Sequence, residues 1–202
     1  MRKPYKAQSK LLGPCGPCCF INLTGMKGSP KKEIELSKIG RRKPFGGTDY
    51  TGFLEWGKKH NLPIQVFTTS NKQDNKMFKF IFKFEKIPQS KRKQKKKEAK
   101  ERFESQNKKF KDKVFLIKNV KSKLNSLLKT NKKVAVCLAV NSSVGFQPHW
   151  VVAYKHQKNK YHFMDSAKGL KGYRILSPHQ LSKAFRKSKE MGFPPALVMI
   201  KK

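Results

Sequence analysis

Apolar residues recur at helical spacing in the first part of the chain. Residues 15–25 form a compact apolar segment that opens with Cys-Gly-Pro and ends at a glycine. Proline suits the first turn of a helix, because its missing N–H would have no intrahelical partner there. Residues 33–40 also end at a glycine, and a Gly-Gly-Thr-Asp turn with a capping residue opens the segment at about 49–59. We therefore predict three short helices, followed by a strand of β-branched and aromatic residues at 64–68.

Strand patterns dominate the second half of the chain. The run at 134–140 is continuously apolar, which predicts a central strand. Residues 149–154 and 161–165 flank the polar residues 155–160, a pattern typical of a β-hairpin. The remaining predicted elements are a helix carrying Leu124, Leu127 and Leu128, a helix from the Ser177-Pro178 cap to about residue 189, and a last strand at 196–200. Helices first and antiparallel strands second make an α+β arrangement.

A basic segment separates the two halves. Residues 89–113 contain 12 Lys or Arg against 4 acidic residues, without Gly or Pro. Opposite charges lie four residues apart at several places, and such pairs favour a helix. Phe103 and Phe110 are the only aromatic residues in this segment. We expect a solvated helical arm outside the core, within a Lys-rich insertion at about 71–113 of a single domain that covers 1–202.

The whole chain is strongly basic. Of its 202 residues, 48 are Lys or Arg and 12 are Asp or Glu, so the formal net charge is +36. Such a surface attracts polyanions, which makes nucleic acid or another polyanion a candidate partner of the Lys-rich arm. Because 37% of the residues are hydrophobic and 11% are aromatic, the chain nevertheless has the material for a folded core.

Apolar runs and cysteines bear on the location of the protein. The run at 134–140 is the longest clean apolar stretch, far below the roughly 20 residues of a membrane-spanning helix. The first residues lack the apolar segment of a secretory signal. We therefore expect no membrane span and a reducing, cytoplasmic setting. Four cysteines, three of them at 15, 18 and 19, make a poor disulfide framework and favour thiol or metal chemistry.

Two interpretations of the cysteine cluster lack part of their usual context. Cys15-Gly16-Pro17-Cys18 has the spacing of a thioredoxin-like redox site, in which a helix N-terminus acidifies the outer thiol. Such a site follows a strand of a βαβ unit, however, and only 14 residues precede Cys15. A metal site would lack a second Cys or His pair at finger-like spacing. Its candidate ligands would be Cys15, Cys18, Cys19 and some of His149, His156 and His162.

The third interpretation makes Cys15 a nucleophile, with a histidine far along the chain as its general base. A hairpin turn centred on residue 157 places His149 directly opposite Asp165, with Cβ atoms about 4.5–5.5 Å apart. There the carboxylate would fix the imidazole tautomer and stabilise the imidazolium that pairs with a thiolate. Gln8 stands seven residues before Cys15 and is a candidate oxyanion donor, together with the backbone N–H of Cys15.

The other two histidines of the hairpin have a different expected role. His162 has the opposite strand parity to Asp165, so its side chain points to the other face of the sheet. His156 falls within the predicted turn. We expect both to be surface or packing residues.

In this arrangement the chain resembles the papain-like cysteine peptidases, and most closely the double-glycine, bacteriocin-processing peptidase family and its uncharacterised relatives. The resemblance covers nearly the whole chain outside the insertion, and the order and spacing of its motifs carry it. The matching segments are Gln8 with Cys15-Gly16-Pro17, Gly47-Thr48 through Trp56 to Leu62, Leu124 to Val140, His149-Trp150-Val151-Val152 and Asp165-Ser166.

The resemblance implies a papain-like fold, in which an N-terminal helical part with the nucleophile helix packs on a C-terminal antiparallel sheet. It implies a cysteine peptidase or related amide hydrolase that acts on a peptide or protein through an acyl-enzyme, without metal or cofactor. The implied roles are Cys15 as nucleophile, His149 as general base, Asp165 as orienting acid and Gln8 in the oxyanion hole. A basic nucleic-acid-binding protein with an unused or lost hydrolase site is the main alternative, and a thiol redox protein is another.

Overall fold

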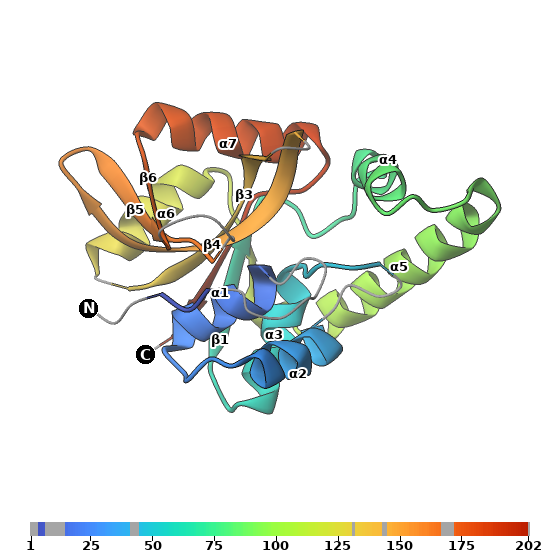
Figure 1. Ribbon diagram of the computed structural model, residues 1–202, viewed down its shortest axis with the longest axis horizontal. Coiled ribbons are helices and arrows are strands. Elements are labelled where there is room, and N and C mark those ends of the chain that lie inside the picture. The colour runs from blue at the N-terminus through green and yellow to red at the C-terminus, as the bar shows by residue number, and fades with distance from the viewer. Residues whose placement is uncertain are drawn as a thin grey trace.

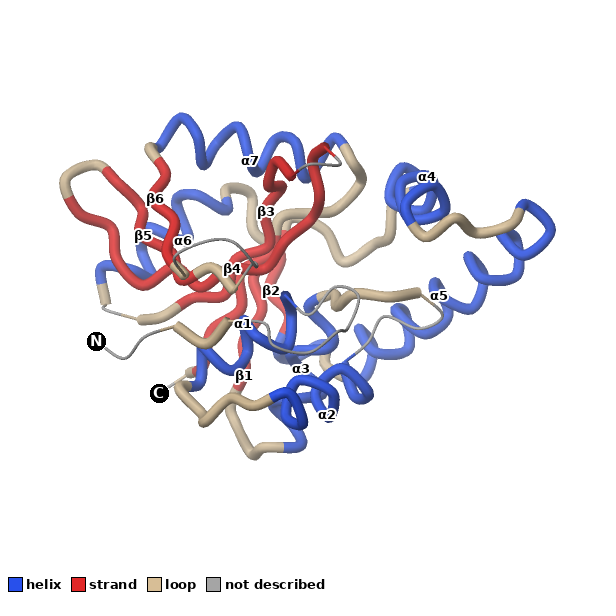
Figure 2. Tube along the Cα trace, viewed as in Figure 1, coloured by secondary structure: helices blue, strands red, loops and turns tan. Residues whose placement is uncertain are grey.

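The computed structural model describes residues 4–6, 15–40, 45–130, 132–142, 145–166 and 172–201. In these ranges, seven α-helices and the seven strands of one sheet combine into a mixed α+β arrangement (Figure 1 and Figure 2). The α+β class predicted from the order of the elements is therefore confirmed. None of the helices in the described ranges has both the length and the apolar character that a membrane span requires.

Three helices come first, as predicted: α1 (Cys15–Thr24), α2 (Pro30–Gly40) and α3 (Tyr50–Lys59). Residues 16–23 of α1 are all buried, so this helix lies inside the molecule rather than on its surface. The Asp49 side chain caps α3 by accepting a hydrogen bond from the backbone N–H of Thr51. The indole N–H of Trp56 donates to the carbonyl of Leu36 at 2.7 Å, which joins α3 to α2.

The sheet is mixed, with strand order β2-β1-β7-β3-β4-β5-β6. Its strands are β1 (Ile64–Thr68), β2 (Val114–Leu116), β3 (Val134–Ser142), β4 (Gly145–Gln157), β5 (Lys160–Met164), β6 (Tyr173–Leu176) and β7 (Ala196–Ile200). The predicted central strand does lie in the middle, as β3. The C-terminal strands β3 to β7 pair antiparallel, as expected, whereas β1 and β2, a strand that we did not predict, pair in parallel. Parallel neighbours need a crossover connection, and here the basic segment provides it.

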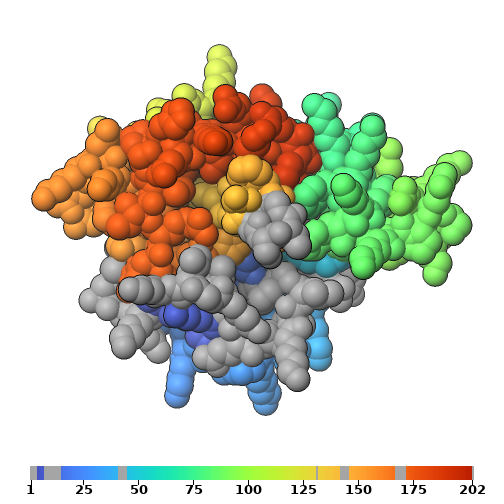
Figure 3. Space-filling view, turned by 45° about the horizontal axis from the view of Figure 1, so that its top comes forward, coloured from blue at the N-terminus to red at the C-terminus, as the bar shows by residue number. Residues whose placement is uncertain are grey.

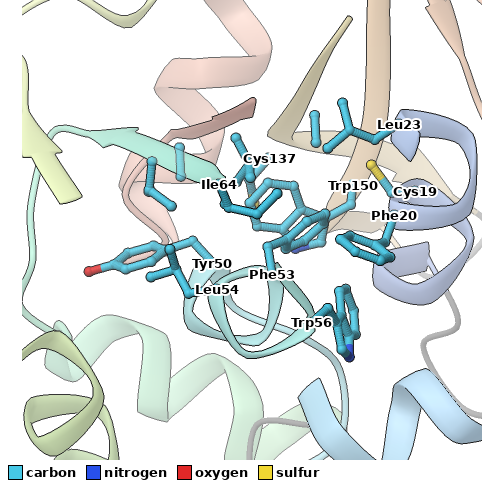
Figure 4. Packing of buried hydrophobic residues seen from close by; sticks show 14 of the residues in the cluster. Cys19, Phe20, Leu23, Tyr50, Phe53, Leu54, Trp56, Ile64, Cys137 and Trp150 are labelled. Carbon is cyan, nitrogen blue, oxygen red and sulfur yellow. The ribbon is translucent and has the colours of Figure 1, made fainter. Parts of the chain in front are cut away.

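Hydrophobic side chains cover both faces of the sheet. On one face, α1 and α3 pack against alternate strand residues such as Cys137 and Trp150 (Figure 4). On the other face, α6 (Val120–Lys129) and α7 (Pro178–Glu190) pack against Val136 and Val151. Because both faces are buried, β3 is apolar at successive positions, which explains the continuous run seen in its sequence.

The basic segment is helical, as predicted, but it also contributes to the core. It forms α5 (Gln89–Lys109), which extends away from the sheet (Figure 1). The helix before it, α4 (Asn75–Phe84), lies within the Lys-rich insertion and was not predicted. Phe103 and Phe110, which we expected to lie outside the core, are buried in the cluster between α3 and the sheet. The Phe103 ring meets that of Tyr50 edge-on at 5.4 Å. Both rings are buried because α5 belongs to the crossover from β1 to β2, so its end returns to the sheet beside β1.

Candidate active site

Cys15 is the first residue of α1, the buried helix beneath the sheet. Its side chain is half-buried, and α1 contacts β4. A helix N-terminus carries partial positive charge and favours a thiolate over a thiol. The next residue must be small, because a Cβ on Gly16 would lie only 2.5 Å from side-chain atoms of Thr48. The Cys-Gly-Pro sequence thus allows the helix to start in close contact with the loop before α3.

His149 and Asp165 form a buried hydrogen-bonded pair. The distance from His149 Nε2 to Asp165 Oδ1 is 2.7 Å, and the two side chains are 10% and 0% exposed. The Cys15 thiol lies near enough to His149 for the two groups to shift each other's pKa. The structure therefore brings Cys15, His149 and Asp165 together from α1, β4 and the end of β5, in the order thiol, imidazole, carboxylate.

The hairpin that brings His149 to Asp165 differs from the one we predicted. Its turn is the two-residue Lys158-Asn159, with positive φ at both residues as type I′ turns require. Asp165 is not directly opposite His149, because Val152 pairs with Met164 and Asp165 follows Met164 beyond the end of β5. The two residues are diagonal neighbours on the same side, close enough for their side chains to meet.

Arg174 completes the site, and sequence reasoning missed it. Its Nε–H donates to Asp165 Oδ2 at 2.8 Å, so each oxygen of the buried carboxylate accepts from a different side chain. The backbone N–H of Asp165 also donates to the carbonyl of Gly172. One arginine among 48 basic residues gives no signal in the sequence. The pairing of β6 with β5 reveals it, since Arg174 lies opposite Phe163, two residues before Asp165.

The environment favours an ion pair between Cys15 and His149. Burial raises the pKa of the Cys15 thiol, but the hydrogen bond and charge of His149 and the backbone N–H groups of Trp150 and Gly16 outweigh it, so this pKa lies below its ordinary value. Burial lowers the pKa of His149, while hydrogen bonds to Asp165 and Cys15 raise it to about 9. Both shifts therefore favour a thiolate beside an imidazolium.

The other cysteines lie in a different environment. Cys18 and Cys19 are buried, and burial together with the neighbouring Glu33 raises the pKa of Cys18. Burial likewise raises the pKa of Cys19 well above its ordinary value. Within the ranges that the structure describes, no group of three or more Cys, His, Asp or Glu side chains is arranged to hold a metal ion. Cys15 is thus the one cysteine of the cluster whose pKa is lowered.

The remaining sequence predictions concern His156, His162 and Gln8. His156 is exposed and stacks on Tyr161 with ring centroids 4.2 Å apart, and it belongs to β4 rather than to the turn. His162 is half-buried and packs beside Tyr154. Both therefore have the surface or packing role that we expected. Gln8 lies outside the described residues, so its assignment to the oxyanion hole stays a prediction.

A short N-terminal segment packs against the underside of the site. The backbone N–H of Tyr5 donates to Asn22 Oδ1 at 2.7 Å, and the Tyr5 hydroxyl donates to Glu33 Oε1 at 2.6 Å. The Tyr5 ring also lies where a Cβ on Gly28 would be. These contacts attach Tyr5, which precedes Gln8 by three residues, to α1 and α2.

Comparison with protein-family models gives no match, and comparison with curated proteins gives none either. The chemistry of this site therefore has to be inferred from the residues that form it.

Proposed function

We propose that this protein is a papain-like cysteine peptidase or a related amide hydrolase, with Cys15 as nucleophile, His149 as general acid and base, and Asp165 as orienting group. The observation that supports it best is the buried hydrogen bond between His149 and Asp165, next to a Cys15 thiol whose pKa the neighbouring His149 lowers. A nucleophile, its base and a third group that orients the base are the parts that covalent catalysis of this kind requires.

In the proposed reaction, the Cys15 thiolate attacks an amide carbonyl, and the carbonyl π electrons move onto oxygen. Our proposed donors to that oxygen are the backbone N–H of Cys15, at the start of α1, and Gln8. Collapse of the tetrahedral intermediate breaks the C–N bond, and His149 gives its proton to the leaving amine. Water, deprotonated by His149, then hydrolyses the thioester and releases the acid.

The pattern of pKa values favours hydrolysis over thiol redox chemistry. In a Cys-x-x-Cys redox site, the second thiol must reach the first and attack it as a thiolate. Here Cys18 is fully buried and its pKa is raised by burial and by Glu33. The lowered pKa of Cys15 has its own cause in His149, a residue that a disulfide exchange site does not need. These features support the hydrolase proposal.

Alkylation by iodoacetamide tests the proposal without knowledge of the substrate. At pH 7 we expect Cys15 to react at least about tenfold faster than Cys18 or Cys19, because only its thiolate is stabilised. Site-specific rates follow from mass spectrometry of peptides after timed labelling. The Cys15 rate of the unchanged protein should rise at a lower pH than the rate of an ordinary thiol, because His149 lowers the pKa of Cys15.

The matched variant in this experiment is His149→Ala, with His156→Ala as the exposed control. Loss of His149 removes the largest influence that lowers the Cys15 pKa, so the rate at pH 7 should fall and should rise only toward the pH range of an ordinary thiol, near 8.5. His156→Ala should leave the rate unchanged. Equal labelling of the three cysteines, or an unchanged profile in His149→Ala, would contradict the proposal.

A further inference from the structure

The α4–α5 projection concentrates positive charge in a way that the proposed hydrolase does not use. We call residues 75–97 the basic hairpin, which holds α4, the connection after it and the first half of α5. It contains ten Lys or Arg and one acidic residue, Glu85, whose carboxylate accepts a hydrogen bond from the backbone N–H of Gly46. In the space-filling view, the green atoms of this region stand out from one side of the molecule (Figure 3).

The charge of the basic hairpin is hardly compensated within the protein. Among the described residues, the one ion pair that its side chains make joins Lys97 to Glu101 at 3.9 Å, and both are largely exposed. The positive end of the α5 dipole adds to the charge, because α5 has no acidic residue in its first turn and no side-chain cap at Pro88. Such an arrangement opposes folding unless an external polyanion neutralises it.

Three of the basic residues also show that the hairpin is an ordered platform. Arg92 lies over the ring of Phe82 at 5.6 Å, and Lys95 and Lys96 lie over Phe45 and Phe78 at 5.9 Å. The contacts of Arg92 and Lys96 hold one side of α5 against α4, and that of Lys95 joins α5 to the loop before α3. Other lysines, among them Lys79, Lys83 and Lys93, point into solvent.

An exposed aromatic ring ends α4, next to Lys83 in the sequence. Phe84 is 55% exposed and stacks on Phe80 with ring centroids 5.9 Å apart and an interplanar angle of 9°. Phe80 in turn meets the Phe193 ring edge-on at 5.6 Å, so the Phe84 ring rests on a supported neighbour. It follows Lys83 directly and precedes Lys86 by two residues.

We propose that the basic hairpin binds single-stranded nucleic acid, with its outward lysines on the phosphates and a base stacked on Phe84. Proteins that bind single strands combine cationic side chains, which contact the phosphates, with aromatic rings, on which the bases stack. In a duplex the bases are stacked on one another, so no base face is available to stack on Phe84. A membrane surface would need a larger apolar face, and the apolar residues Met77, Phe78 and Ile81 of α4 are buried in the protein.

Charge-matched variants separate this site from general attraction by a protein of charge +36. The test variant is Lys79→Gln/Lys83→Gln/Lys93→Gln, and the control is Lys155→Gln/Lys158→Gln/Lys160→Gln, three exposed lysines around the β4–β5 turn. Binding of a fluorescein-labelled 20-nucleotide single strand is followed by anisotropy at several salt concentrations. We expect the affinity of the test variant to fall at least about tenfold. The slope of log K against log salt concentration should become shallower by about 2, because phosphate contacts are lost. Both changes should be much smaller in the control.

A second pair of variants tests the stacking contact. Phe84→Ala should weaken binding about tenfold, whereas Phe84→Trp should retain it, because either aromatic ring can stack on a base. A duplex of the same sequence and vesicles rich in phosphatidylserine, at equal phosphate concentration, should bind more weakly than the single strand. Equal losses in the two lysine variants, no effect of Phe84→Ala, or a preference for duplex or vesicles would each overturn the proposal. Cys15 alkylation in the same variants should be unchanged, so the result is independent of the hydrolase proposal.

Discussion

A Cys15→Ala variant is expected to lose amide hydrolysis by at least about 10⁴-fold, because removal of a nucleophile leaves only binding and oxyanion stabilisation. Fluorogenic peptide amides provide the measurement, and the panel includes peptides with two glycines before the scissile bond, since the resemblance to double-glycine peptidases implies such substrates. The loss should appear in kcat, as expected for a group that acts in the transition state. The fold should persist, because Cys15 is half-buried and alanine favours a helix.

Cys137→Ala is the matched control for this prediction. Cys137 is buried on β3 in the same hydrophobic cluster as α1, so its replacement removes a thiol close to the site without touching the proposed chemistry. Its activity should remain within a few-fold of that of the unchanged protein. Hydrolysis that survives in Cys15→Ala but disappears in Cys18→Ala would show that the proposed nucleophile is wrong.

Arg174→Gln is expected to lower the free energy of unfolding by about 2 kcal/mol, since it deprives a fully buried carboxylate of a charged partner. The usual cost of breaking a buried ion pair is discounted here, because the Arg174 side chain is 26% exposed and water can replace part of its contact. Urea unfolding at pH 7 measures the change. Arg186→Gln is the control, because Arg186 forms a 3.8 Å pair with Glu190 at the surface, and should change stability by less than about 0.5 kcal/mol.

Arg174 is also expected to act as a positioning residue for the proposed chemistry. With Oδ2 released, the Asp165 carboxylate can rotate away from His149, and the ion pair between His149 and Cys15 loses its support. We expect Cys15 alkylation at pH 7 to fall about tenfold in folded Arg174→Gln, a loss of about 1.4 kcal/mol in the stabilisation of the thiolate. Arg174→Lys should restore part of that rate. A variant that loses stability but keeps the alkylation profile would limit Arg174 to a structural role.

Local patterns in the sequence were enough to predict most of the elements. Pro17 and Gly25 delimit α1, Asp49 caps α3, and the Ser177-Pro178 cap opens α7 with a complete capping box. Each of these signals depends on residues within one or two helical turns of the element it defines. For the same reason the sequence placed Cys15 at the start of a helix, where its thiolate is favoured.

The crossover between β1 and β2 could not be predicted from such local signals. An amphipathic pattern predicts that a helix forms, but the face against which it packs depends on residues far along the chain. Phe103 and Phe110 stand in a segment dominated by lysine, so composition assigned them to solvent. They are buried because the parallel pairing of β1 and β2 returns the end of α5 to the core.

The contact between His149 and Asp165 depends partly on local sequence patterns and partly on how the strands pair. Strand periodicity and the polar stretch between the two strands were sufficient to predict the hairpin. The register next to the turn pairs Lys155 with His162, and if it continued, Asp165 would be opposite Val152 and would point away from His149. A bulge at Tyr154 shifts the pairing by one residue, and a shift of one residue exchanges the faces of a strand.

Local sequence patterns were therefore enough to predict most of the helices and strands and the kinds of side chain at the site, but not α4, β2 or β6. The contact between His149 and Asp165, and the addition of Arg174 from β6, arose only when the strands paired. The physical reason is that helical and strand periodicity are set by neighbours in sequence, whereas strand register is set by the packing of whole faces against the helices that cover them.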